Sequence, residues 1–136
     1  MGSPAVRYLL DTHIWLWSLL DPGRLTTEVS SALKDSGNEL WLSPISLWEF
    51  SVLEDRGRIE LSNPFEGWVE KALAITPIRQ APVTLEIALA TRQLDLGHHD
   101  PADRFIAATA LIHDLTLITA DRRLIDSNRI RVLANR

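Results

Sequence analysis

The sequence has no cysteine among its 136 residues, which excludes disulfide bonds and thiolate metal sites. It also has no apolar run near the ~20 residues that a membrane-spanning helix needs, since the stretch IWLWSLL is about a third of that length. A broad basic surface is missing as well, because the formal net charge is −4. These absences fit a reducing compartment and leave room only for a local contact with nucleic acid.

The whole chain, residues 1–136, is expected to form one domain, because its length allows a single sizeable core. Hydrophobic residues make up 46% and charged residues 24% of the sequence, as in ordinary soluble globular proteins. Repeats, linkers and low-complexity segments are not found. Residues 1–5 are expected to be a cloning remnant or disordered. The first residues lack the basic-then-apolar pattern of a secretory signal, so we expect a cytoplasmic protein.

Short apolar runs alternate with helical segments along the chain. This alternation predicts an α/β fold with a mostly parallel central sheet flanked by helices on both faces. Prolines 77 and 82 allow at most an interrupted short strand within 75–83. Other strands are expected at 6–10, 39–43, 115–119 and 130–133. Helices are expected at 13–20, 28–37, 45–56, 65–74 and 85–94, from 101 onward, and as a short turn at 121–127. Most of the tryptophans (15, 17, 41, 48 and 68) are expected in the core.

Three aspartates are predicted to lie at one rim of this sheet. Asp11 directly follows the first strand, and Asp121 lies two residues past the strand LTLIT. Both therefore fall at the carboxyl ends of strands, where ligands bind in open parallel sheets. Asp103 lies in the first turn of a helix that leads into the LTLIT strand. Right-handed crossovers start such a helix at the same rim. Each aspartate alone could also be a cap or loop residue, which needs no ligand.

Glu49 interrupts an apolar helical stripe. Its neighbours at i−4, i+3 and i+4 are Ile45, Val52 and Leu53, so its side chain is predicted to face the core. An ionised carboxylate there is costly unless it is paired, for example with an arginine, or holds a metal. Both interpretations stay open for Glu49 by itself.

Taken together, the four acids predict a cation site. Four carboxylates at one rim would repel each other strongly, and a hard divalent cation relieves that repulsion. Oxygen-only ligands favour one or two Mg²⁺ or Mn²⁺ ions over Zn²⁺. His13, His98 and His99 match no zinc motif and are expected to be cap or loop residues, one of which could contact substrate.

Four segments of the sequence resemble, in order, the acidic motifs of PIN-domain ribonucleases. They are YLLDTHIWLW, SPISLWEF, HHDPADRFIAATA and LTLITADRRL, and the likeness runs from about Arg7 to Leu133. Among these ribonucleases, the sequence is most similar to the VapC toxins of bacterial type II toxin–antitoxin pairs. The specificity of the resemblance lies in the order and spacing of the segments rather than in any single one.

The resemblance implies a role for each acid. It assigns the first acid to Asp11, the second to Glu49, the third to Asp103 and the more variable fourth to Asp121. Asp100 is the alternative third ligand, but the helix is expected to start at Pro101, which makes Asp100 its cap and turns Asp103 inward. Thr12 and Thr119 match positions that often lie beside the metal.

The resemblance also implies the activity and its partners. The reaction would be metal-dependent hydrolysis of RNA phosphodiester bonds, leaving 5′-phosphate and 3′-hydroxyl ends. Arg104, Arg122 and Arg123 flank the site and are candidates to hold phosphates. A cognate antitoxin and a homodimer are expected, with Trp15, Trp17 and Trp48 as candidate anchors for the antitoxin.

Three other functions compete with this one. A receiver-type signalling module also gathers acids and Mg²⁺ at strand ends. It needs a lysine at a late strand end, whereas Lys34 and Lys71 both lie in expected helices. A PIN-like scaffold without catalysis would have kept the fold alone. A nuclease for structured DNA would use the same metal chemistry. It stays an alternative because no residue of the sequence is identified as a contact for the 2′-hydroxyl of RNA.

Overall fold

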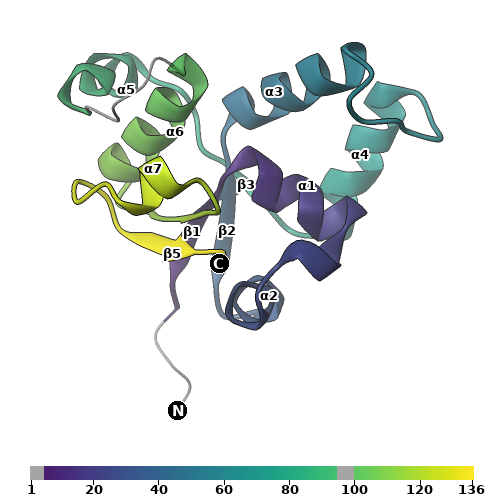
Figure 1. The fold of residues 1–136 in the computed structure, drawn as a ribbon, viewed down its shortest axis with the longest axis horizontal. Coiled ribbons are helices and arrows are strands. Elements are labelled where there is room, and N and C mark those ends of the chain that lie inside the picture. Colours follow the sequence, from purple (N-terminus) through teal and green to yellow (C-terminus); the bar gives the residue numbers. More distant parts are fainter. Residues whose placement is uncertain (1–4, 95–99) are drawn as a thin grey trace.

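The computed structural model describes residues 5–94 and 100–136 and confirms the expected α/β architecture. The sheet in this part of the chain has the order β3-β2-β1-β4-β5, and every neighbouring pair is parallel (Figure 1). Its strands are β1 (Arg7–Leu10), β2 (Glu39–Leu42), β3 (Arg79–Gln80), β4 (Thr116–Thr119) and β5 (Val132–Ala134). The two-residue β3 is the short strand that the flanking prolines predicted.

Helices cover both faces of the sheet. They are α1 (Thr12–Leu20), α2 (Thr27–Lys34), α3 (Pro44–Asp55), α4 (Phe65–Ile75), α5 (Leu85–Ala90), α6 (Pro101–Ile112) and α7 (Arg122–Ile125), with 3₁₀ turns η1 (Pro22–Arg24) and η2 (Thr91–Gln93). In Figure 1, α5 and α6 lie on one side of the sheet, and α1, α2 and α4 lie on the other. None of the helices in the described residues is long and apolar enough to cross a membrane.

Alternating residues of the central strands feed two separate cores. Leu9 and Leu117 point toward α5 and α6, where they pack with Ile106 and Ala107. The next residue of β1, Leu10, points the other way. It belongs to a second core with Phe50 and residues of α1, α2 and α4. This period of two, in strands buried on both faces, is why the strands appear in the sequence as continuous apolar runs.

Two predicted helices end earlier than the sequence suggested. The helix expected to reach Gly37 ends at Lys34. Asp35 takes an extended backbone there, and its side chain accepts the Gly37 N–H at 2.9 Å. Such an Asx turn offers the backbone an alternative to continuing the helix. The helix expected at 85–94 ends at Ala90 and tightens into the 3₁₀ turn η2.

The tryptophans are less buried than expected. Trp15 is 3% exposed and packs edge-on against Phe50. Trp17, Trp41 and Trp68 are half-buried against the two cores. Trp48 is 57% exposed. Burial of Trp15 excludes it as an anchor for a partner protein.

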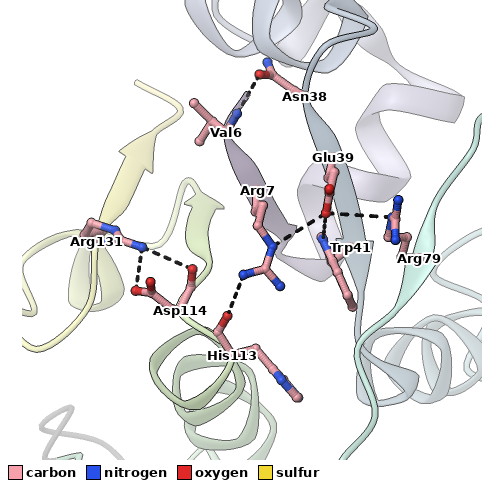
Figure 2. A network of polar contacts seen from close by, with 9 residues as sticks. All are labelled: Val6, Arg7, Asn38, Glu39, Trp41, Arg79, His113, Asp114 and Arg131. Atoms are coloured by element: carbon pink, nitrogen blue, oxygen red, sulfur yellow. Dashed lines mark hydrogen bonds and ion pairs between the residues drawn. The ribbon is translucent and has the colours of Figure 1, made fainter. Parts of the chain in front are cut away.

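The amino ends of the strands carry a network of ion pairs (Figure 2). Glu39 lies between Arg7 and Arg79, with Oε1 3.5 and 3.8 Å from their Nε atoms. Both guanidinium groups also lie over the Trp41 ring, at 5.1 and 5.7 Å from its centroid. The two arginines at this end thus share one carboxylate of the protein, and the candidate site lies at the opposite edge of the sheet.

Candidate metal centre

Asp11 and Asp121 follow the two adjacent central strands, as predicted. β1 and β4 pair in register through Leu10 and Ile118, so their carboxyl ends meet at one edge. Asp11 is 8% exposed and caps α1 by accepting the Thr12 N–H at 2.8 Å. Asp121 is half-buried and caps α7 by accepting the Arg123 N–H at 2.9 Å.

The Thr119 hydroxyl links these two acids. It is fully buried and donates to Asp11 Oδ2 at 2.6 Å. The same oxygen accepts the backbone N–H of Asp121 at 3.0 Å. One hydroxyl therefore orients the Asp11 carboxylate and fixes the start of the loop that carries Asp121.

Glu49 reaches the rim from α3. Its Oε1 accepts the Thr12 hydroxyl at 2.5 Å, and its side chain is half-buried. Ser46, one turn earlier on α3 and fully buried, lies 3.0 Å from the same hydroxyl. A hydroxyl has one proton, and that of Thr12 goes to Glu49, so Ser46 is the donor in the second contact. The interruption of the apolar stripe is thus explained by a polar link between α1 and α3.

Asp103 and Asp100 differ in burial, as their helix positions predicted. Asp100 is exposed and caps α6, accepting the Ala102 N–H at 3.0 Å. Asp103 lies in the first turn of α6 and is only 9% exposed. A buried first-turn carboxylate is better placed than the exposed cap to serve an interior site. The assignment of Asp103 as the third ligand stays a prediction.

Electrostatics connect all five carboxyl groups. The pKa of Asp103 is raised to about 8, first by burial and then by repulsion from Asp11, Asp100, Asp121 and Glu49. Burial also raises the pKa of Asp11, against the opposing effect of its hydrogen bonds from Thr119 and Thr12. These shifts mean that the acids are close enough to disfavour one another's charge.

The pKa of Glu49 is raised for the same reason. Burial is the largest cause, the Thr12 hydrogen bond opposes it, and the charges of Asp11 and Asp100 add to it. Three acids on three separate elements therefore share one electrostatic environment.

The donor set fits a hard divalent cation. Carboxylate oxygens are the ligands that Mg²⁺ and Mn²⁺ prefer, and a cation would remove the repulsion that raises the pKa values. Within residues 5–94 and 100–136, however, no three acidic or histidine side chains already form a group that could hold an ion. The carboxylates would have to draw together around a cation.

The remaining predicted residues lie around the rim or outside the described residues. Arg122 and Arg123 are exposed in the short helix after Asp121, and Arg104 is half-buried next to Asp103. His13 is exposed, and its charge lowers the pKa of both Asp11 and Glu49. His98 and His99 lie outside the described residues.

Ser46 is the site residue that sequence reasoning missed. The available signal was its spacing, because a serine three residues before a core-facing glutamate lies on the same helix face. The serine alone looked like an ordinary residue in the first turn of a helix.

Comparison with known proteins gives consistent matches. Residues 8–129 match the family of the PIN domain. The chain is 35% identical over 117 residues to Ribonuclease VapC22 of Mycobacterium tuberculosis, covering 85% of this chain and 88% of that protein.

Solved structures share the fold. A VapBC2 structure from Rickettsia felis, bound to a promoter DNA fragment, superposes with a TM-score of 0.70 at 14% identity, covering 95% of this chain and 98% of that one. A toxin–antitoxin complex from Klebsiella pneumoniae gives 0.64 at 23% identity with the same coverage.

Proposed function

Because this chain belongs to the PIN domain family, we propose that it is a metal-dependent endoribonuclease toxin held inactive by a cognate antitoxin. The similarity to a ribonuclease over 85% of the chain supports the activity. Membership of this family also rules out the receiver-type signalling module. One observation carries the proposal: acids that follow β1 and β4 or lie on α3 and α6 share one rim, and burial and mutual repulsion raise the pKa values of Asp11, Glu49 and Asp103 there.

The proposed ligands of one or two Mg²⁺ or Mn²⁺ ions are Asp11, Glu49, Asp103 and Asp121. Such ions, when bound, supply a water of lowered pKa for in-line attack and a Lewis acid for the phosphoryl oxygens. The protein's part is to hold the carboxylates in place: Thr119 orients Asp11, and Thr12 orients Glu49. Hydroxyl partners of this kind fix ligand geometry around a metal.

The substrate proposed for this site is RNA, cleaved to 5′-phosphate and 3′-hydroxyl ends. Arg122 is exposed directly after the Asp121 cap, where its guanidinium is free to meet a phosphate of the strand. Arg104 and Asp100 border the same rim. A cytoplasmic location is part of the proposal, because an RNA substrate is found there.

The proposed protein partners are an antitoxin and a second copy of the chain. Structures of similar fold are described as toxin–antitoxin complexes, which supports the first, and the exposed Trp48 offers an aromatic anchor for it. The second rests on α5, where Leu85 is 90% and Leu89 69% exposed. These leucines are one turn apart and form an apolar face suited to self-association.

The decisive experiment is cleavage of an end-labelled structured RNA by the purified, antitoxin-free protein, with Mn²⁺ or with EDTA. We expect cleavage in Mn²⁺ and none in EDTA. The cleavage rate should fall at least ~100-fold in the Asp11→Asn and Glu49→Gln variants. Asp114→Asn is the matched control, because Asp114 is exposed and pairs with Arg131 at the far end of β4.

Two results would count against the proposal. Cleavage that survives in both acid variants would show a contaminating nuclease. A wild-type protein that binds Mn²⁺, seen as a rise in Tm, but cleaves no RNA would favour the scaffold. A structured DNA is tested in parallel, and cleavage of this DNA in place of the RNA would favour the DNA nuclease.

A further inference from the structure

A groove of about 300 Å³ runs along α1, beginning next to the acidic rim. One wall is a single face of this helix, formed by His13, Leu16, Trp17 and Leu20, at the i, i+3, i+4 and i+7 positions. The opposite wall comes from Leu53 at the end of α3 and from the segment that follows it. The span from His13 to Leu20 is about 10 Å at 1.5 Å per residue.

The groove lies beside the acidic rim. His13, which lines it, comes two residues after Asp11 in the sequence, and its charge acts on both Asp11 and Glu49. A strand whose phosphate lies at the carboxylates would therefore also lie near His13 and this groove.

Two arginines bring positive charge to this groove. Arg24 and Arg58 both line it, and both are exposed. Among the described residues neither forms an ion pair with an acid. The arginines at the amino ends of the strands behave differently, since Arg7 and Arg79 share Glu39 (Figure 2). In a chain of net charge −4, two unneutralised guanidinium groups beside an acidic site favour an anionic ligand.

Trp17 adds an aromatic surface beside Arg24 in this groove. Its ring centroid lies 5.8 Å from that of His13, and the Arg24 guanidinium carbon lies 4.4 Å from the Trp17 ring centroid. An aromatic ring with an adjacent arginine is the combination on which bases of single-stranded nucleic acid stack while their phosphates are held.

We infer that this groove is a substrate subsite, which binds a nucleotide of the RNA next to the cleaved bond. Its base packs on Trp17 and the apolar wall, and its phosphate contacts Arg24 and Arg58. The inference rests on the proposed ribonuclease function and adds to it the path that the RNA strand takes next to the acidic rim. Positive charge and nearness to that rim favour RNA over a peptide in this groove.

The test is binding rather than cleavage, so that it does not depend on the reaction. The Glu49→Gln protein in Mn²⁺ is titrated into a fluorescein-labelled single-stranded RNA of mixed sequence, and anisotropy is followed at several salt concentrations. Arg24→Gln and Arg58→Gln in this background should each weaken binding about 10-fold. Each should also reduce the slope of log K against log salt by about 0.7, as expected for one lost phosphate contact.

Stacking is tested at Trp17. Trp17→Leu should weaken binding by about 10-fold or more without changing the salt slope, and Trp17→Phe should restore most of the affinity. Arg129→Gln is the control, because Arg129 is exposed on the loop before β5 and lines a different groove. Melting curves check that every variant is folded.

Unchanged affinity and salt slope in both arginine variants would overturn the inference and leave the groove to a peptide partner. That result is compatible with RNA cleavage by the wild type, so the proposed function would stand. Conversely, RNA binding through this groove without any cleavage would support the subsite and contradict the proposed ribonuclease function.

Discussion

Asp103 is repelled by the other four carboxyl groups at the rim. Asp11, Asp100, Asp121 and Glu49 all raise its pKa, in addition to the larger effect of burial. Asp11, by contrast, accepts two hydrogen bonds that oppose its rise. At the scale of the single residue, the site is therefore a place where the fold is destabilised in order to gather charge, as is common at functional sites.

The first prediction concerns the pH dependence of the metal-free protein. The pKa of Asp103 is about 8 in the fold against an ordinary 3.8. Between these values the folded state binds a proton that the unfolded state has lost. The stabilising effect is complete below about pH 4 and is lost as pH rises through about 8. In EDTA, the Tm of the wild type should therefore fall across this range.

Asp103→Asn should flatten that fall and raise the Tm at pH 8 by several degrees, at roughly 4 °C per kcal/mol for a domain of this size. Part of the slope should remain, because the pKa values of Asp11 and Glu49 are raised too. Thermal unfolding from pH 4 to 9 measures the effect, with Asp114→Asn as control. An unchanged slope in Asp103→Asn would refute the assigned burial of this carboxylate.

At the scale of the elements, capping residues decide where each helix begins relative to the rim. Asp11, Ser43, Asp100 and Asp121 cap α1, α3, α6 and α7 through their side chains. Two of these caps, Asp11 and Asp121, are also proposed ligands, and Asp100 is the alternative to Asp103. The same local chemistry that starts the helix thus brings the carboxylate to the carboxyl edge of the sheet.

Two glycines provide a matched prediction for helix stability. Gly57 follows α3 with φ +73°, and Gly67 lies inside α4; neither has an atom within 4 Å of an added Cβ. Gly57→Ala should destabilise the protein by about 1 kcal/mol, because alanine is strained in the left-handed region. Gly67→Ala should stabilise it by about 0.5–1 kcal/mol, because glycine is a poor helix former.

Urea unfolding of the two variants measures the change in the free energy of unfolding, which should be negative for Gly57→Ala and positive for Gly67→Ala. Since an added Cβ would meet no other part of the protein at either position, the two effects should reflect backbone conformation. Equal effects in both variants would contradict the assigned end of α3.

At the scale of the whole molecule, exposed apolar side chains gather on α5, on the side of the sheet opposite α1, α2 and α4 (Figure 1). The prediction is that the free protein is a dimer in solution and that the double variant Leu85→Ser/Leu89→Ser is a monomer. Light scattering coupled to gel filtration gives the mass directly. Ile75→Ser on α4 is the control, because Ile75 is also 75% exposed but lies on the other helical layer. A wild-type monomer, or a double variant that stays dimeric, would exclude α5 as the contact.

The sequence by itself determined the order of the elements, the parallel sheet and the acids at its rim. Those features depend on local information: runs of apolar residues, prolines and caps at element ends, and acids placed directly after strands. The interruption of an apolar stripe by Glu49 was enough to predict that its side chain points inward, and the structure confirms this orientation.

Only the tertiary structure decided which side chains meet. Thr12 contacts Ser46 and Glu49, which lie 34 and 37 positions later in the sequence. The hydrogen bond from Thr119 to Asp11 joins residues that are 108 positions apart. Burial was also beyond local information, since it placed Trp15 in the core and left Trp48 exposed. Contacts between distant segments depend on how helices pack across the sheet, and a sequence pattern records only the face a residue occupies, not the neighbour it finds there.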